Sequence, residues 1–282
     1  IAVINGGYFT TSSSTLEGMV ITGRRLIAAT VGSYSVVAFG HDGSMNIVTT
    51  QPKYTLTIGS NSYNNPIYFF NKDYNDASSD AKSSSLFYND YYRNASTSYN
   101  NSRIEVVFEK QNGTELAYGK TLIGKVVKKN SSTTGGTSFS KNQFSLFAKS
   151  GSTYASALSG LAVGDTIELS VTETNADAVN IMNSCTSALS NIDYLVKDGK
   201  DYTLEKTTLG GHSVTSTYAR WTAYGVKADG TYVFLTSEGG STGISSRSLT
   251  LRNVANILLE LGCVTAVRLD GGGSTGMYLS NT

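Results

Sequence analysis

The sequence predicts an α+β protein, a strand-dominated mixed sheet with a few helices, and three observations support that class. Short runs of alternating apolar and polar residues recur along the 282 residues. The chain contains 29 glycines and 18 tyrosines but only 2 prolines, which is typical of strands joined by tight turns. One amphipathic helix lies near the C-terminus. We expect a single domain that spans residues 1–282 and carries long polar loops.

The composition argues against several classes of function. Charged residues make up 15% of the chain, against a typical value of about 25%, and the net charge is +1. That charge gives no electrostatic support for a nucleic-acid partner. No apolar run approaches the ~20 residues of a membrane span. A surface of neutral polar residues and tyrosines suits contact with sugars and favours an exported protein.

The first 60 residues predict short strands separated by turns at Gly, Asn and Asp. The runs are IAVI, GMVITGRRLIAATV, SYSVVAFG, MNIVTT and YTLTIG. Because the first run begins at Ile1, we expect a further segment upstream. Residues 61–101 are polar and weakly periodic, so we expect long loops there, of the kind that cover a site. Asp73, Asp76 and Asp80 lack the spacing of an EF-hand, which favours a solvated loop over a calcium site.

The middle of the chain predicts hairpins and two helices. Residues 103–129 alternate around Asn112-Gly113, which is a hairpin signal. The runs FSLFAKSG and DTIELSVTET are expected to be strands, and STYASALSGLAVG between them a short helix that ends near Gly160. We expect a second helix over residues 176–189, followed by a hairpin in IDYLVKDGKDYTL. The run RWTAYGVKADGTYVFLTSEG predicts a strand, a turn and a strand.

The helix near the C-terminus is the clearest element. Thr250 is a suitable N-cap, and Gly262 supplies the stop. Its apolar residues recur at i, i+3, i+4, i+7 and i+8, at Leu251, Val254, Ala255, Leu258 and Leu259. The strand at residues 264–269 follows almost directly and brings Asp270 to one edge of the sheet.

Two cysteines and two histidines limit the metal and redox chemistry of the chain. Cys185 and Cys263 have neither a CxxC motif nor metal-ligand spacing, and they form either one disulfide or two buried thiols. His41 lies in a predicted surface turn and His212 in a loop. This pattern argues against a multi-histidine metal centre, and we expect no metal and no cofactor.

The segment after the last predicted strand is a candidate ligand site. Asp270 ends an alternating apolar run, and the three glycines Gly271 to Gly273 follow it. Consecutive glycines expose backbone N–H groups, which can form a nest that binds an anion such as phosphate. A purely structural turn is the alternative. The pattern GGSTG resembles a nucleophile elbow at Ser274, but only eight residues (282 − 274) follow, with neither Asp nor His, which excludes that type of serine hydrolase.

Six stretches occur in the order seen in a known family. They are INGGYF, GMVITGRRL, LSNIDYLVKDGK, ARWTAYGVKADG, LTLRNVANILLELG and VRLDGGGST. Together they resemble the phosphodiester glycosidase family along the whole chain, most strongly over residues 220–274. The resemblance implies hydrolysis of a sugar-1-phosphodiester of the N-acetylglucosamine-1-phospho-sugar type, between the anomeric carbon and the bridging phosphate oxygen. It also implies a carbohydrate phosphodiester as the substrate and an exported location.

The resemblance also implies which residues form the site. The catalytic candidates are Asn5, Arg220, Glu238 and Asp270. The substrate-binding candidates are Gly6, Gly7, Gly271, Gly272, Gly273 and Ser274. Arg220 and the glycine turn would hold the departing phosphate, and Asp270 would stabilise the oxocarbenium-like centre or activate water.

Two departures from the family pattern bear on the site. Trp221 stands between Arg220 and Thr222 where the family usually reads Arg-Thr-Ala, and an extra residue turns a side chain to the other face of a strand unless a bulge absorbs it. Glu238 stands where the family usually has Asp. Two other functions therefore remain open, an inactive glycan-binding or cell-surface module on the same scaffold and a phosphodiesterase that cuts the P–O bond.

Overall fold

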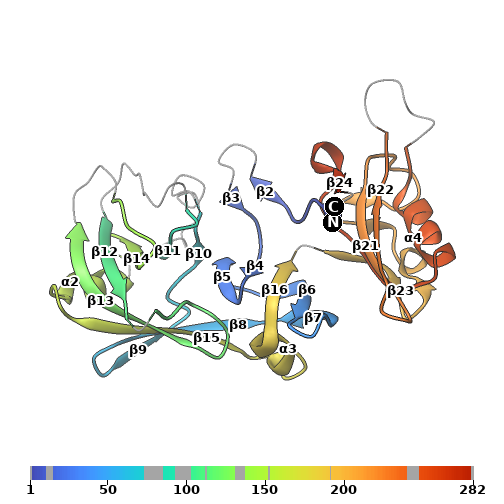
Figure 1. Cartoon of the computed structure of the whole chain (residues 1–282). Coiled ribbons are helices and arrows are strands. Elements are labelled where there is room, and N and C mark those ends of the chain that lie inside the picture. Colours follow the sequence, from blue (N-terminus) through green and yellow to red (C-terminus); the bar gives the residue numbers. More distant parts are fainter. Residues whose placement is uncertain are drawn as a thin grey trace. The chain divides into compact units, whose positions relative to one another are not determined.

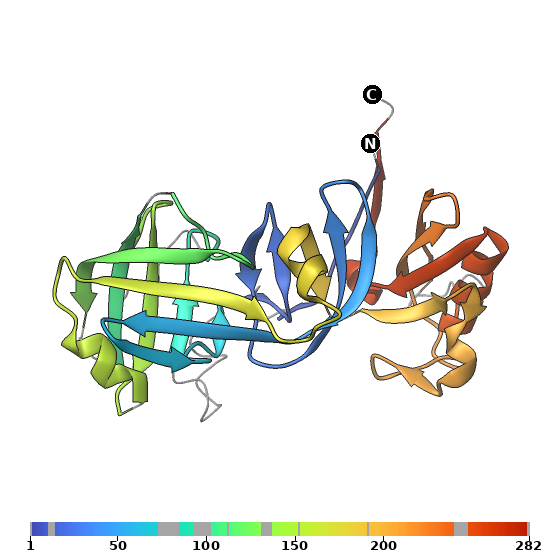
Figure 2. The same ribbon diagram turned by 90° about the horizontal axis from the view of Figure 1, so that it is seen from below.

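The structure is a computed structural model, shown in two views in Figure 1 and Figure 2. It describes residues 2–10, 15–72, 85–92, 103–111, 113–130, 137–151, 153–190, 192–239 and 248–280. Contacts divide the chain into two compact units. Unit 1 combines Ile1–Tyr8 with Asn191–Thr282, and unit 2 is Phe9–Ser190. Strands dominate and helices are few, which confirms the predicted α+β class. The extent of one glycosidase-like domain over residues 1–282 stays a prediction.

Unit 2 contains an eight-stranded sheet that is antiparallel except for the short pair β10–β11. Its strands, in spatial order, are β10 (Phe69–Phe70), β11 (Ser85–Tyr88), β14 (Gln143–Lys149), β12 (Arg103–Lys110), β13 (Thr121–Asn130), β15 (Thr166–Glu173), β8 (Pro52–Ile58) and β9 (Asn61–Asn64). In its core, Phe108 and Phe144 stack with ring centroids 5.0 Å apart. Gly124 leaves room for this pair, because a Cβ there would lie 2.5 Å from the Phe144 ring.

The second large sheet of unit 2 has five strands. They are, in spatial order, β5 (Arg25–Ala28), β4 (Val20–Thr22), β16 (Cys185–Ser190), β6 (Tyr34–Gly40) and β7 (Met45–Thr50). The strands β2 (Phe9–Thr10) and β3 (Thr15–Leu16) form a separate ribbon. Among the described residues of this unit, the α-helices are α2 (Thr153–Gly160) and α3 (Val179–Ser184). These elements confirm the strands predicted in the first 60 residues and the short helix that ends near Gly160.

One predicted helix of unit 2 is wrong in its second half. The helix expected over residues 176–189 ends at Ser184, and Cys185–Ser190 continues as strand β16. This strand pairs with β6 on one side and β4 on the other, so long-range hydrogen bonds override the local helical pattern.

One loop prediction of unit 2 is also corrected. Residues 61–101 include strands β9, β10 and β11, on which Phe70 and Phe87 are buried. The expected lid and its residues Asp73, Asp76 and Asp80 lie outside the described residues. The strands within 103–129 pair as predicted, and the connection between Lys110 and Thr121 includes a Thr114 N–H bond to the Gln111 carbonyl.

Unit 1 is built on a five-stranded sheet with helix α4 packed against it (Figure 1). The strands, in spatial order, are β18 (Lys200–Asp201), β17 (Asp193–Lys197), β23 (Cys263–Arg268), β21 (Thr222–Lys227) and β22 (Tyr232–Thr236). Leu195 and Ala223 of the sheet form a core with Val254 and Leu258 of α4. Two ribbons complete the unit, β1 (Ala2–Ile4) with β24 (Met277–Leu279) and β19 (Thr208–Leu209) with β20 (His212–Ser213).

Helix α4 (Leu251–Glu260) has the predicted N-cap. The Thr250 hydroxyl accepts from the Asn253 backbone N–H, and the Asn253 side chain accepts from the Thr250 N–H in return. Gly262 has φ +87°, the left-handed conformation that ends helices. Within the described residues, no helix has the length and apolarity needed to cross a bilayer. Cys185 and Cys263 are two buried free thiols, which settles the alternative left open by the sequence.

Candidate active site

One end of the unit 1 sheet collects most of the predicted site residues. Strand β21 begins just after Arg220, β22 ends just before Glu238, and β23 ends just before Asp270. Thr222 pairs with Thr236; beyond this pair the Ser237 N–H donates to the Trp221 carbonyl, while the Trp221 N–H donates to the Ser237 hydroxyl. Arg220 and Glu238 come directly before and after these two residues in the sequence.

The Asp270 carboxylate is fixed by its own backbone surroundings. Its backbone N–H donates to the Gly6 carbonyl at 3.1 Å, which ties the end of β23 to the turn after β1. Its Oδ1 accepts a hydrogen bond from the Gly271 N–H at 2.9 Å. The side chain is half-buried. A carboxylate oriented in this way is available to a ligand through its second oxygen.

Asn5 holds three segments of the site together. Its Nδ2 donates to the Asp270 carbonyl at 2.8 Å, while its Oδ1 accepts from the Thr222 hydroxyl at 2.6 Å and from the Gly276 N–H at 3.1 Å. Both lone pairs of the amide oxygen are therefore used within the fold. These hydrogen bonds position the Asp270 backbone, and the catalytic role expected of Asn5 stays a prediction.

The glycine turn differs from the expected nest of three free N–H groups. Residues Gly272–Ser274 form a 3-10 turn, in which the Ser274 N–H donates to the Gly271 carbonyl. The Gly271 N–H donates to Asp270 and the Gly272 N–H to the Arg220 carbonyl, at 2.9 Å each. Among the described residues, only the Gly273 N–H of the three glycines has no partner. The turn therefore offers an anion one backbone donor rather than three.

The three glycines meet different constraints. A Cβ on Gly271 would lie 2.8 Å from the Arg220 carbonyl, so close packing excludes a side chain there. Gly272 has φ +60°, which favours glycine. Gly273 has neither constraint, since a Cβ there would meet no atom within 4 Å. The fold itself does not require glycine at position 273, whereas a ligand that approaches the backbone would.

The insertion of Trp221 is accommodated outside the strand. Trp221 is buried, and its indole N–H donates to the Leu249 carbonyl at 2.7 Å. The Leu269 N–H donates to the Thr222 carbonyl, so regular antiparallel pairing would continue with a bond from the Gly271 N–H to the Arg220 carbonyl. The Gly272 N–H makes that bond instead. This one-residue shift is a bulge whose extra residue lies on the β23 side, at the glycine turn, and not beside Trp221.

Arg220 presents a free charge beside this turn. Its side chain is exposed, and among the described residues its guanidinium makes no hydrogen bond or ion pair. The carbonyl of the same residue is bonded to Gly272, so the arginine and the glycine turn form one local structure. A guanidinium in such a place can bind a phosphate through two parallel hydrogen bonds.

Four residues that were not predicted from the sequence extend the site. Arg268 on β23 is only 2% exposed, and its Nε and Nη2 donate to Asp193 Oδ2 at 3.1 and 2.5 Å. Its Nη1 donates to the Tyr8 hydroxyl. Gly210 lies against the guanidinium, since a Cβ there would overlap Nη2. An arginine within an apolar strand run was the signal in the sequence, because a buried charge needs partners.

The Tyr8 hydroxyl lies in the electrostatic field of the site. Burial raises its pKa above the ordinary value, and the nearby Asp270 and Asp193 add to that effect, while Arg268 opposes it. Tyr8 is therefore protonated at neutral pH. Because Arg268 donates to the Tyr8 oxygen, the tyrosine proton is directed to another acceptor.

The remaining predicted residues, Glu238, Gly6 and Gly7, lie around the same end of the sheet. Glu238 is exposed at the end of β22, Gly6 supplies the carbonyl that binds the Asp270 N–H, and Gly7 is half-buried in the same turn. The His212 ring packs edge-on against Trp221, with centroids 5.3 Å apart. The described residues contain no group of three or more His, Cys, Asp or Glu side chains able to hold a metal ion.

Comparison with known proteins identifies the family. The model of the phosphodiester glycosidase family matches residues 120–282, more than half of the chain. The chain belongs to the phosphodiester glycosidase family. The matched region contains Arg220, Asp270 and the glycine turn, whereas Asn5 and Tyr8 lie upstream of it.

The similar proteins extend this result to the fold. The SPbeta prophage-derived uncharacterized protein YomE of Bacillus subtilis (strain 168) is 36% identical over 93 residues, which cover 31% of this chain and 14% of YomE. A hypothetical protein from Synechocystis has a similar structure, with TM-score 0.67 and 18% identity, over 99% of this chain and 47% of its own. The structure of a candidate exported protein from Burkholderia pseudomallei K96243 is also similar, with TM-score 0.66 and 20% identity. The match covers 98% of this chain and 60% of the Burkholderia protein. The chain thus spans only part of the length of each of these proteins, and the two structures show a shared fold.

Proposed function

We propose that the chain hydrolyses a sugar-1-phosphodiester, of the N-acetylglucosamine-1-phospho-sugar type, and releases the free sugar. The observation that carries this proposal is the free guanidinium of Arg220, joined through its carbonyl to the turn that begins at Asp270. A free cation and a carboxylate at one sheet end suit a substrate in which a phosphate and an anomeric carbon are neighbours. Membership of the phosphodiester glycosidase family supports the same reaction class.

The reaction divides between the two ends of the scissile bond. Arg220 and the Gly273 N–H bind the phosphate oxygens and stabilise the charge that develops as the phosphate leaves. Asp270 faces the anomeric carbon and stabilises its oxocarbenium-like character. The bond from the anomeric carbon to the bridging oxygen breaks, and its electron pair leaves with the phosphate monoester. Water supplies the new sugar hydroxyl, and the proton that it loses passes to the solvent.

Tyr8 and Arg268 have a supporting role in this scheme. The hydrogen bonds from Arg268 to Asp193 and to Tyr8 fix the tyrosine hydroxyl and leave its proton free to donate to a substrate oxygen. A phosphate monoester is a good leaving group, so this donor orients the substrate more than it drives bond cleavage. Asn5 positions the backbone of Asp270. Residues 1–8 are therefore required for activity, although they lie outside the region matched by the family model.

The direct test measures release of free sugar from an N-acetylglucosamine-1-phospho-sugar. Asp270→Asn should reduce the rate by about 10³-fold, because the charge at the anomeric carbon is lost while the shape is kept. Asp198→Asn is the matched control, since Asp198 is exposed in the β17–β18 turn and Asn tolerates its φ of +52°. Equal rates for both variants, or no release by the wild type, would contradict the proposal. Sugar binding without turnover would indicate an inactive glycan-binding module.

We also propose that the protein is exported. The structurally similar Burkholderia protein is a candidate exported protein, and the chain has the low charge and polar surface expected outside the cell. Fractionation of cells that express the full-length protein should place it outside the cytoplasm. Recovery in the cytoplasmic fraction alone would contradict this location.

A further inference from the structure

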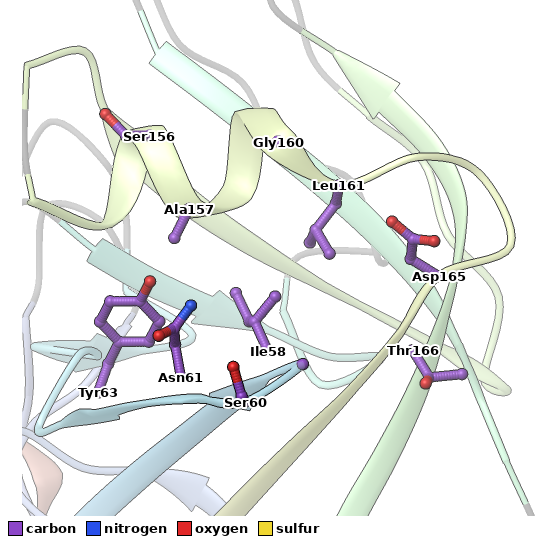
Figure 3. A pocket seen from close by; sticks show the side chains of 11 residues that line it. Ile58, Ser60, Asn61, Tyr63, Ser156, Ala157, Gly160, Leu161, Asp165 and Thr166 are labelled. Carbon is purple, nitrogen blue, oxygen red and sulfur yellow. The ribbon is translucent and has the colours of Figure 1, made fainter.

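Unit 2 contains an open cavity with a volume of about 610 Å³, which lies between the β8–β9 hairpin and helix α2 (Figure 3). Its lining residues are Ile58, Gly59, Ser60, Asn61, Tyr63, Ser156, Ala157, Gly160, Leu161, Asp165 and Thr166. All of them belong to unit 2, and none has a role in the hydrolytic scheme above. The volume is within the range of small-molecule sites, about 300–1,000 Å³.

The lining of this cavity is amphipathic. Figure 3 shows Ile58 and Tyr63 directed from the hairpin toward the helix, and Ala157 and Leu161 directed back toward the hairpin. These side chains supply the apolar part of the wall. Hydroxyl and amide groups interrupt it at the rim, including the exposed Asn61. A ligand that fits this wall needs both an apolar face and several hydroxyl or amide groups.

The charge of the lining disfavours anionic ligands. It contains one carboxylate, Asp165, and no Lys, Arg or His. Asp165 Oδ2 accepts a hydrogen bond from the Ala162 N–H at 2.8 Å, which orients the carboxylate and leaves its other oxygen available. Asp165 would repel a negatively charged ligand, and the ammonium of Lys129, which is not a lining residue, donates to the Ser159 and Leu161 carbonyls. The cavity therefore favours an uncharged ligand that donates hydrogen bonds.

The Tyr63 ring is held in place before any ligand binds. It packs edge-on against Tyr154, with ring centroids 5.6 Å apart and planes at 78°. The Tyr154 hydroxyl in turn donates to the Asn64 carbonyl at 3.2 Å. Strand β9, which carries both Tyr63 and Asn64, is the edge strand of the eight-stranded sheet. A fixed aromatic ring binds a flat apolar ligand face at a low entropic cost.

We propose that this cavity binds an uncharged saccharide unit. The C–H face of a pyranose ring stacks on Tyr63, and its hydroxyl groups donate to Asp165 and exchange hydrogen bonds with Asn61. The site is separate from the hydrolytic residues of unit 1, so the chain holds a neutral part of a glycan independently of cleavage. The proposal depends on the cavity and does not rest on the reaction proposed above.

The test applies the full chain to an array of neutral and anionic glycans, followed by calorimetric titration with a neutral oligosaccharide that binds. Tyr63→Ala should weaken binding by at least about tenfold, the scale of one aromatic contact. Tyr278→Ala is the matched control, since Tyr278 is exposed on strand β24 of unit 1. Asn61→Ala removes only a rim amide and provides a second variant if Tyr63→Ala fails to fold. Asp270→Asn should bind the oligosaccharide as the wild type does.

Loss of binding in Tyr63→Ala or Asn61→Ala, with binding kept in Tyr278→Ala, supports the saccharide site. No binding to any neutral glycan, preference for anionic glycans, or equal loss in Tyr63→Ala and Tyr278→Ala overturns it. Binding of an extended peptide along β9 in place of a glycan also overturns it. Binding that persists in a chain without hydrolytic activity supports the cavity and counts against the proposed reaction alone.

Discussion

Both units pair a partly buried arginine with a carboxylate, whereas unit 1 also has an exposed arginine with no partner among the described residues. In unit 2, the guanidinium of Arg25 is paired with Asp90 at 2.5 Å and with Glu115 at 3.1 Å. In unit 1, Arg268 is paired in the same manner with Asp193, but Arg220 has no partner among the described residues. A charge compensated within the fold has a structural role, whereas a free charge beside a carboxylate suits an external ligand.

The largest expected effect comes from removing the free charge. Arg220→Gln should lower kcat/KM for a sugar-1-phosphodiester by about 10²–10³-fold, because the phosphate loses a bidentate charged donor. Arg220→Lys should restore only part of the rate, since an ammonium cannot make the planar two-bond contact. Arg24→Gln is the control, because Arg24 is an exposed arginine of unit 2. Similar rates for Arg220→Gln and Arg24→Gln would contradict the role of Arg220 in binding the phosphate.

The second effect concerns the stability of unit 1. Asn5→Ala removes three hydrogen bonds that join the turn after β1 to β21 and the glycine turn, and should lower the free energy of unfolding by about 2–3 kcal/mol. Urea unfolding measures this change. Asn256→Ala, at an exposed position on α4, should leave the free energy of unfolding nearly unchanged. A change below about 0.5 kcal/mol in Asn5→Ala would show that Asn5 does not hold these segments together.

A smaller effect is expected at Tyr8. Tyr8→Phe keeps the ring and removes the hydroxyl that accepts from Arg268, and kcat should fall by about tenfold. Because the pKa of Tyr8 is raised, this donor stays protonated at neutral and mildly alkaline pH. The wild-type rate should therefore show no loss from tyrosine ionisation below pH ~10. An unchanged kcat in Tyr8→Phe would limit the hydroxyl to a structural role.

The smallest expected effect concerns the Arg25–Asp90 ion pair of unit 2. Burial raises the pKa of Asp90, but the hydrogen bond and charge of Arg25 outweigh burial and hold that pKa below its ordinary value. The stabilisation is thus present above pH ~3.9, the value for the unfolded chain, and is lost as the pH falls through the lower folded pKa. The stability difference between wild type and Asp90→Asn should shrink between neutral pH and pH ~3. A constant difference would contradict this pairing.

Local signals predicted some elements correctly and long-range pairing determined the others. Helix α4 was readable because Thr250, the apolar spacing and Gly262 act within one segment. The run that follows Ser184 has a helical pattern, but it forms β16 because β6 and β4 supply partners distant in the sequence. No local signal could reveal those partners.

The candidate site shows the same division. The motif stretches located Arg220 and Asp270, and the structure places them at one sheet end. The prediction that the glycine turn exposes consecutive free N–H groups is wrong, because the Gly272 N–H donates to the Arg220 carbonyl. A sequence does not show such a hydrogen-bond partner. The sequence does not predict Tyr8 and Arg268 as site residues, because they meet through a hydrogen bond between residues 260 positions apart.

Hydrolysis in ¹⁸O-labelled water tests the central claim most directly. The wild-type chain acts on an N-acetylglucosamine-1-phospho-sugar, and mass spectrometry locates the label in the products. We predict that the label enters the released sugar, since water adds to the anomeric carbon opposite Asp270. Label in the phosphate would indicate cleavage of the P–O bond and contradict the assignment, as would a product mixture that Asp270→Asn leaves unchanged.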